Sequence, residues 1–248
     1  MKNRKFVLVL FCVLLTTTTL AYAKKDRNQL MKDSVAAYEQ GNYDKALEIL
    51  RPLAQKGDAN AQHNLGVLYQ NGQGIEQNYM EARKWYEKAA KQGYAYSQNN
   101  LGNIYLDGLG VEQDYNQARR WFMKAAKQNN ANAQNALGIM YEEGWGGSQD
   151  YNKAKQWHEK AAKQGFVNSQ FNLGVLYERG LGVKRDYIQA VKWYEKAAKQ
   201  GHDKAQFNLA AMYHLGKGVA QDDKKAREWL EKAAAQGNER AKEHLQKF

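Results

Sequence analysis

The chain has 248 residues, a formal net charge of +11 and a single cysteine, Cys12. Cys12 lies in a segment that we expect to be removed, and a mature chain without cysteine excludes a disulfide, a thiol nucleophile and a zinc site with cysteine ligands. Loss of the three basic residues of that segment would lower the net charge from +11 to +8. In an exported protein, this charge favours acidic or anionic partners over nucleic acid.

Residues 1–23 have the three parts of a secretory signal peptide. A basic start is followed by an apolar run over residues 6–15 and by an Ala-Tyr-Ala cleavage signal at residues 21–23. The alternative is a retained membrane anchor, but this run is shorter than the ~20 apolar residues that span a bilayer. We therefore expect cleavage after Ala23 and a mature protein that is periplasmic or secreted, two destinations between which the sequence does not decide.

Residues 24–57 are expected to form an atypical first helical hairpin. One helix is predicted over residues 26–40 and a second over residues 43–55, with a turn at Gly41 and Asn42. The lone proline, Pro52, lies in the second of these helices. It is expected to kink that helix or to mark its early end.

A 36-residue unit then repeats five times without insertion or deletion, which indicates a repeat architecture. The units are residues 58–93, 94–129, 130–165, 166–201 and 202–237, and residues 238–248 are expected to form a capping half-repeat. One column of the repeat is glycine with a single exception: Gly66, Gly102, Gly138, Gly174 and Ala210. Another is invariant tryptophan: Trp85, Trp121, Trp157, Trp193 and Trp229.

Each unit is predicted to contain two helices, because its apolar residues recur at spacings of three and four. A Gly-x-Gly turn separates them, and its first glycine is expected to end the first helix in a left-handed conformation. Asparagine or aspartate then caps the second helix, at Asn78, Asp114, Asp150, Asp186 and Asp222. Glycine ends the second helix, with Asn129 as the one substitute.

A single hairpin of this kind cannot bury its aromatic rings, so the hairpins are expected to stack into an all-α solenoid of antiparallel helix pairs. The tryptophan and tyrosine columns are expected to fill the space between hairpins. Trp157→Ala is accordingly predicted to cost about 3–5 kcal/mol.

The sequence resembles the Sel1-like repeats, a longer relative of the tetratricopeptide repeat. The pattern A-x-x-x-L-G-x-x-Y-x-x-G-x-G followed by D-Y-x-x-A-x-x-W-x-x-K-A-A-x-x-G stands almost unaltered in residues 97–126 and 169–201, where serine replaces the first alanine. The resemblance implies a right-handed superhelix that acts as an adaptor for other proteins. The cysteine-rich exported members tie each hairpin with a disulfide, whereas this chain must rely on packing.

The resemblance also implies that the first helices line a concave surface, where a ladder of asparagines could hold a peptide backbone. This asparagine column comprises Asn64, Asn100, Ala136, Asn172 and Asn208. The alternative is that these side chains fasten neighbouring helices or face water.

Positions beside the asparagine column vary between units, as a recognition surface would. The preceding column contains His63, Asn99, Asn135, Phe171 and Phe207, and Asn103 and Tyr96 lie nearby in the second unit. Three residues after the asparagine column stand Val67, Asn103, Ile139, Val175 and Ala211, and three residues further on stand Gln70, Leu106, Glu142, Glu178 and His214. Phe171 and Phe207 would form an apolar anchor or pack between hairpins. Trp145, in a turn, would be an exposed contact or fold back onto its own hairpin.

No enzymatic constellation is recognised in the sequence. The histidines lack zinc-site spacing and are expected to be solvated, no serine has a lysine three residues on, and no metal or cofactor is expected. The sequence therefore predicts a scaffold that is not an enzyme and does not span the membrane. It is expected to be a monomer that binds a protein or peptide, and an acidic partner would match its net charge. The alternative is a cell-envelope hydrolase, related to peptidoglycan or penicillin, or a carbohydrate-binding protein.

Overall fold

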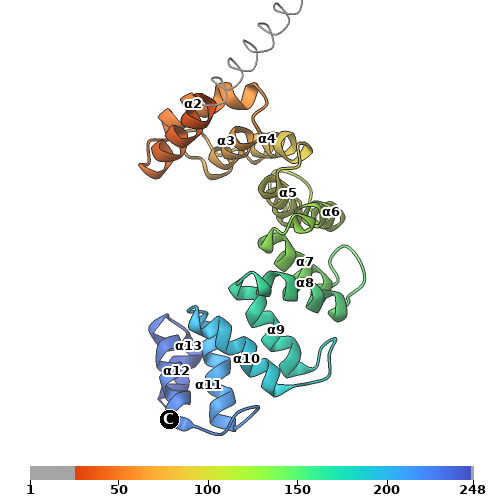
Figure 1. The fold of residues 1–248 in the computed structure, drawn as a ribbon, viewed down its shortest axis with the longest axis vertical. Coiled ribbons are helices and arrows are strands. Elements are labelled where there is room, and N and C mark those ends of the chain that lie inside the picture. The colour runs from red at the N-terminus through yellow and green to blue at the C-terminus, as the bar shows by residue number, and fades with distance from the viewer. Residues whose placement is uncertain (1–25, 247–248) are drawn as a thin grey trace, which may run out of the picture. The chain divides into compact units, whose positions relative to one another are not determined.

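The structure is a computed structural model that describes residues 26–246, and every element of regular secondary structure in this range is a helix. The predicted all-α fold class is therefore confirmed. A helix over residues 26–39 comes first (Figure 1). The helices that follow are α2 (Tyr43–Gln55), α3 (Ala59–Asn71), α4 (Tyr79–Lys91), α5 (Ala95–Asp107), α6 (Tyr115–Lys127), α7 (Ala131–Glu143), α8 (Tyr151–Lys163), α9 (Val167–Arg179), α10 (Tyr187–Lys199), α11 (Asp203–Leu215), α12 (Asp223–Ala235) and α13 (Glu239–Leu245).

The chain divides into two compact units. The first holds the residues up to Ser97 together with Leu109–Val111, and the second holds Gln98–Gly108 together with the residues from Glu112 onward. Consecutive helices pack as antiparallel pairs: α3 with α4 in the first unit, and α7 with α8, α9 with α10 and α11 with α12 in the second. Each unit is thus a stack of helix pairs, as predicted.

The predicted capping residues begin the second helices. In each of the five repeats, the capping side chain accepts a hydrogen bond from the backbone N–H three residues later, as Asp150 does from Lys153 at 3.0 Å. This bond satisfies an N–H group that has no partner within the helix. The prediction is therefore confirmed at Asn78, Asp114, Asp150, Asp186 and Asp222.

The second glycine of each Gly-x-Gly turn has a role that the sequence pattern did not predict. Gly182 has a φ of +65°, and a Cβ atom placed on it would lie 2.5 Å from the backbone carbonyl carbon of Tyr151. Tyr151 is the first residue of α8, in the preceding repeat. Glycine is therefore required for close packing of the turn against the start of that helix.

Helix α2 spans Tyr43–Gln55, the bounds predicted for the second helix of the first hairpin. It continues through Pro52, so of the two alternatives for this proline the early helix end is wrong. Pro52 has no N–H group to donate to the carbonyl four residues earlier, but its own carbonyl accepts from the Lys56 N–H at 3.1 Å, so the last turn of the helix still closes. Leu53 and Ala54 are buried after it, which holds this last turn against the core.

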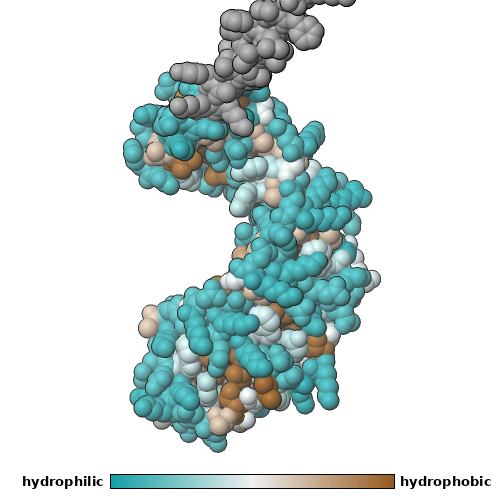
Figure 2. Space-filling view, in the orientation of Figure 1, coloured by the Kyte–Doolittle hydropathy of each residue, from teal (hydrophilic) through white to brown (hydrophobic). Residues whose placement is uncertain are grey.

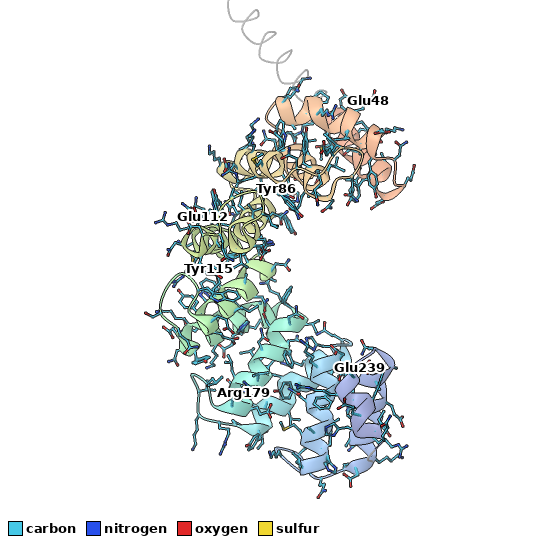
Figure 3. The ribbon with its side chains drawn as sticks, turned by 180° about the vertical axis from the view of Figure 1, so that it is seen from behind. Glu48, Tyr86, Glu112, Tyr115, Arg179 and Glu239 are labelled. Atoms are coloured by element: carbon cyan, nitrogen blue, oxygen red, sulfur yellow. The ribbon has the colours of Figure 1, made fainter. Side chains whose placement is uncertain are left out.

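The fully buried column lies one residue after the tryptophans. Tyr86 (labelled in Figure 3), Phe122, His158 and Tyr194 are 0% exposed, and Leu230 is 4% exposed. This inner column comprises Tyr86, Phe122, His158, Tyr194 and Leu230. The expectation that every histidine is solvated is therefore wrong for His158, whose place in this column requires burial.

The tryptophans are only half-buried. Each packs at the edge of the core, and a lysine three residues later covers its ring. Lys124 Nζ, for example, lies 3.9 Å from the Trp121 ring centroid. The same contact recurs for Lys88, Lys160, Lys196 and Lys232, at 3.8–4.2 Å. The tryptophan column therefore fills only part of the space between hairpins. It forms the edge of the core, where a lysine covers each ring.

The glycine column makes room for the inner column. A Cβ atom on Gly102 would lie 2.5 Å from the ring of Phe122, and one on Gly174 would overlap the ring of Tyr194 in the same way. Ala210 is the only member of the glycine column with a side chain, and it faces the only repeat whose inner residue is the ringless Leu230. The two columns thus vary together because they share one space.

We expect Gly102→Ala to lower the free energy of unfolding by about 1–3 kcal/mol, because overpacking outweighs the better helix propensity of alanine. Phe122→Leu in the same chain would recreate the pairing of Ala210 with Leu230. The double variant should therefore be more stable than the sum of the single changes predicts, by at least about 1 kcal/mol. Urea unfolding of the four proteins measures this coupling, and strict additivity would contradict the shared-space assignment.

A ladder of buried glutamines, which was not predicted from the sequence, joins successive repeats. Gln134 on α7 is 1% exposed, donates to the carbonyl oxygen of Ala126 at 3.2 Å and accepts from Gln164 at 2.7 Å. Gln134 therefore links the C-terminal ends of α6 and α8. The bond between glutamines 30 residues apart recurs at 2.7–2.8 Å for Gln62 with Gln92, Gln98 with Gln128, Gln170 with Gln200 and Gln206 with Gln236.

Gln134→Ala is expected to cost about 1–3 kcal/mol, because it removes two hydrogen bonds of a buried side chain and leaves the Gln164 amide without its partner. Gln156→Ala on the exposed face of α8 is the matched control, with an expected change within about 0.5 kcal/mol. Thermal and urea unfolding of both variants test this pair. Equal stability of the two would show that the ladder contributes nothing net.

Ion pairs one helical turn apart line the exposed faces of the second helices. Glu87 pairs with Arg83 at 3.7 Å, Glu159 with Lys155 at 3.4 Å and Glu195 with Lys199 at 4.0 Å. Trp145 is half-buried and packs against the core cluster that contains Leu137 and Met140 of its own hairpin. It also stacks on Tyr115 of the preceding repeat, with ring centroids 5.5 Å apart.

Candidate functional site

A groove of about 260 Å³ opens between the first helices of the first unit. Its lining is mostly apolar and comes from the helix of residues 26–39, from α2 and from α3. The lining residues are Ser34, Val35, Tyr38, Leu50, Asn64, Val67 and Leu68. The surface shown in Figure 2 is mostly hydrophilic, with apolar patches of small extent.

Asn64 is the polar group of this groove. It is half-buried, and its side-chain amide has no hydrogen-bond partner among the described residues. Val67 lies one helical turn later and also lines the groove. An unpaired amide beside apolar side chains can hydrogen-bond a peptide group while an apolar side chain of the same ligand fills the cavity.

The wall opposite α3 is held in place by hydrogen bonds. The Tyr38 hydroxyl donates to Gln73 Oε1 at 3.1 Å, and Gln73 Nε2 donates to the Tyr43 hydroxyl at 3.1 Å. Ser34, which is buried, donates to the Met31 carbonyl at 2.8 Å. Val35 is 44% exposed on the same helix, so an apolar contact is presented on a fixed wall.

The rest of the asparagine column is not uniform. Asn172 is half-buried and, like Asn64, has no hydrogen-bond partner among the described residues. Asn100 accepts a long 3.4 Å bond from Asn99, and Asn208 shares a hydrogen bond with the Tyr194 hydroxyl. Asn208 thus serves the scaffold, whereas the amides of Asn64 and Asn172 are unpaired within residues 26–246.

The preceding column lies against the next repeat. His63 Nδ1 is 2.9 Å from Ser97 Oγ, and Ser169 Oγ donates to Asn135 Oδ1 at 2.8 Å. Phe171 and Phe207 instead face alanines at the positions of these serines in the repeat, Ala205 and Ala241. In four of the five repeats the chemistry of this column therefore follows that of the neighbouring helix, and the exception is Asn99, whose partner position is Ala133.

The two phenylalanines are half-buried. Phe171 stacks on His202 with ring centroids 4.6 Å apart, and Phe207 meets the edge of His244 at 5.4 Å. These contacts agree with the alternative in which the rings pack between hairpins. Their exposed parts remain predicted partner contacts.

Of the other predicted contacts, Tyr96 and Asn103 are exposed and accessible to a partner, Tyr96 at 58%. Asn99 is only 9% exposed and offers little surface. Tyr96 belongs to an aromatic cluster with His63 and Tyr94, and the ring centroids of His63 and Tyr94 are 5.1 Å apart. Burial lowers the pKa of His63 from its ordinary value of 6.5 to about 4.

The column of Gln70, Leu106, Glu142, Glu178 and His214 follows the inner column. The Tyr86 hydroxyl donates to Gln70 Oε1 at 3.0 Å, and the Tyr194 hydroxyl donates to Glu178 Oε2 at 2.5 Å. His158 Nε2 lies 3.2 Å from Glu142 Oε1, without hydrogen-bond geometry. The polar residues Gln70, Glu142 and Glu178 thus face polar groups of the inner column, whereas His214 bonds Asp223 at 2.7 Å.

Within residues 26–246, no group of three or more His, Cys, Asp or Glu side chains is placed to hold a metal ion. No helix in that range is both long and apolar enough to cross a membrane. The predicted signal peptide lies outside the described residues.

Comparison with known proteins identifies the repeat. The sequence model of the family described as Sel1 repeat matches residues 59–94, 95–130, 131–166, 167–202 and 203–238. A Sel1 repeat protein from Oxalobacter formigenes is 35% identical with a TM-score of 0.81, and the alignment covers 87% of this chain and 86% of that one. A search of curated proteins gave no match.

A second solved structure is a protective antigen present in uropathogenic Escherichia coli strains that displays an SLR fold. It is 37% identical with a TM-score of 0.81, and the alignment covers 88% of this chain. This chain spans 50% of that relative's length. A sel1 repeat protein from Klebsiella pneumoniae, 23% identical with a TM-score of 0.52 over 80% of this chain and 96% of that one, shares the fold.

Proposed function

The chain belongs to the Sel1 repeat family, whose members generally mediate protein–protein interactions, and we propose that it is a scaffold that binds a segment of a partner protein. The proposed site is the groove lined by Asn64 and Val67 in the first unit. The observation that carries this proposal is the unpaired Asn64 amide beside an apolar cavity of about 260 Å³. A peptide with one apolar side chain matches both features.

We further propose that the mature protein is exported to the periplasm or secreted. The basic start, apolar run and Ala-Tyr-Ala signal of residues 1–23 support export. A relative that is a protective antigen is consistent with an exported protein, although this chain spans only half of that relative. N-terminal sequencing of the protein recovered from the periplasm or medium should begin at Lys24, and recovery of the intact N-terminus would overturn cleavage.

Photocrosslinking tests the groove. A photoreactive amino acid at Val67 should capture a partner in cells, and the same residue at Lys84 on the exposed face of α4 should not. Capture at Phe171 but not at Val67 would move the site to the second unit. Equal capture at Val67 and Lys84 would overturn a specific groove.

Once a partner is captured, two asparagine variants separate recognition from folding. We expect Asn64→Ala to weaken partner binding about fivefold to tenfold through loss of one hydrogen bond, with stability unchanged within about 0.5 kcal/mol. Asn208→Ala is the control, since it removes a bond to Tyr194 and should cost about 1 kcal/mol of stability instead. Isothermal titration and urea unfolding measure the two effects. Destabilisation by Asn64→Ala without a change in affinity would make Asn64 a scaffold residue.

A further inference from the structure

A second cavity, of about 690 Å³, lies in the second unit at the turn between α9 and α10. The turn begins after Arg179, the last residue of α9 and labelled in Figure 3. The cavity is lined by Lys155, Tyr177, Val183, Lys184, Arg185, Asp186, Tyr187, Ile188 and Gly218. None of these residues belongs to the groove of the first unit.

The repeats provide an internal comparison for this turn. Where the fourth repeat has Lys184 and Arg185, the other four have Glu76-Gln77, Glu112-Gln113, Ser148-Gln149 and Ala220-Gln221. In the first three repeats this glutamine donates to a carbonyl oxygen near the end of the first helix, at 2.6–2.8 Å. Arg185 makes no such bond, so the fourth repeat gives up a scaffold contact and gains a pair of cations.

The cations of this cavity are only partly neutralised. Lys184 and Arg185, which line the cavity, form no ion pair with a described carboxylate, and neither does Lys217, which precedes the lining residue Gly218. Lys155 is paired with Glu159 at 3.4 Å. Asp186, the acidic group of the lining, accepts a hydrogen bond from the backbone N–H of Gln189 at 3.0 Å as the cap of α10. The cavity therefore carries excess positive charge.

Aromatic and aliphatic surface accompanies these cations. Arg185 and Lys217 lie 5.5 Å and 5.6 Å from the Tyr187 ring centroid. Ile188 is 58% exposed, whereas asparagine occupies its position in the second and third repeats. An exposed isoleucine beside unpaired cations suits a ligand that carries both negative charge and an apolar side chain.

We propose that this cavity binds an acidic segment of a protein partner. Carboxylates of the segment would pair with Lys184, Arg185 and Lys155, since an arginine guanidinium matches carboxylate geometry. An aliphatic side chain of the segment would cover Ile188. This surface adds a second contact to the scaffold and does not depend on the groove at Asn64.

The swap Lys184→Ser with Arg185→Gln, which copies the turn of the third repeat, tests the proposal. The probe is a fluorescein-labelled peptide of sequence Glu-Asp-Leu-Glu-Asp, and fluorescence anisotropy measures its Kd at low salt. We expect the swap to raise the Kd at least tenfold while leaving the thermal midpoint unchanged or higher, because the introduced glutamine regains the scaffold bond. Ile188→Asn should raise the Kd about threefold to tenfold.

The matched control is Lys127→Ser with Lys163→Gln, two exposed lysines on α6 and α8. This variant loses the same two charges and should change the Kd less than threefold. Equal weakening by both double variants, or no binding of the peptide to the wild-type protein, would overturn the proposal. Binding to phosphatidylglycerol vesicles that is lost in the swap, with peptide binding intact, would make the surface lipid-binding and also overturn it. Capture at Val67 should be the same in the swap and the wild type.

Discussion

Phe122→Ala is expected to lower the free energy of unfolding by about 3–5 kcal/mol, among the largest effects of any single substitution in the chain. The Phe122 ring is 0% exposed and packs against Gly102, Leu137 and the alanines of α6. Glycine has no side chain with which to fill the space that the ring leaves. The cavity therefore persists, and urea unfolding followed by circular dichroism should show the full cost.

Trp121→Ala is the matched control one residue earlier on the same helix. Its indole is larger than the phenyl ring, but it is half-buried and covered by Lys124. We expect a cost of about 1–2 kcal/mol, since only the buried part of the ring loses contacts. By the same reasoning, Trp157→Ala should lower the free energy of unfolding by less than the roughly 3–5 kcal/mol expected from the sequence. A larger loss for Trp121→Ala than for Phe122→Ala would reverse the assignment of the core column.

The helical pattern could be predicted because its signals are local. A capping aspartate acts on an N–H three residues away, and a left-handed glycine ends the helix in which it lies. Such features recur at fixed positions, as Asp150 and Gly144 show. The fold class and the helix ends could therefore be predicted by comparing the repeats with one another.

The burial of each aromatic column could not be derived in the same way. Trp157 and His158 are adjacent on one helix, and hydrophobicity alone favours burial of the tryptophan. The helix is rotated so that the narrow space at Gly138 receives the smaller ring. The joint change to Ala210 and Leu230 was a usable sequence signal for this contact.

The candidate site was predictable only in part. Asn64 lines a groove between the first hairpin and α3, whereas Asn208 at the equivalent position bonds to Tyr194. Whether an asparagine is free depends on the residue that the neighbouring helix presents. The cationic turn at Lys184 and Arg185 was not predicted, because it lies outside the first helices, where a partner was expected to bind.

Acidification is expected to destabilise the protein through His63. Burial lowers the folded-state pKa of His63 to about 4, against 6.5 for an unperturbed histidine. Between these values the unfolded chain binds a proton that the folded chain excludes, so the free energy of unfolding falls as the pH drops from about 6.5 to about 4. Neutral His63 contributes at most about 3 kcal/mol to the free energy of unfolding, and this contribution is fully present above pH 6.5.

His63→Asn should remove this dependence while keeping the hydrogen bond, because Asn135 at the equivalent position already accepts from Ser169. Above about pH 7 both proteins are neutral at this site, so their difference in stability gives the packing cost of the substitution alone. Urea unfolding at about pH 7.5 and pH 4.5 measures how far the free energy of unfolding falls on acidification. We expect this fall to be about 2–3 kcal/mol smaller in the variant than in the wild type. The loss that remains includes His202, whose pKa burial also lowers. A stability difference that is constant across this range would mean that His63 takes up its proton in the folded state, and that the aromatic cluster with Tyr94 and Tyr96 admits a charge.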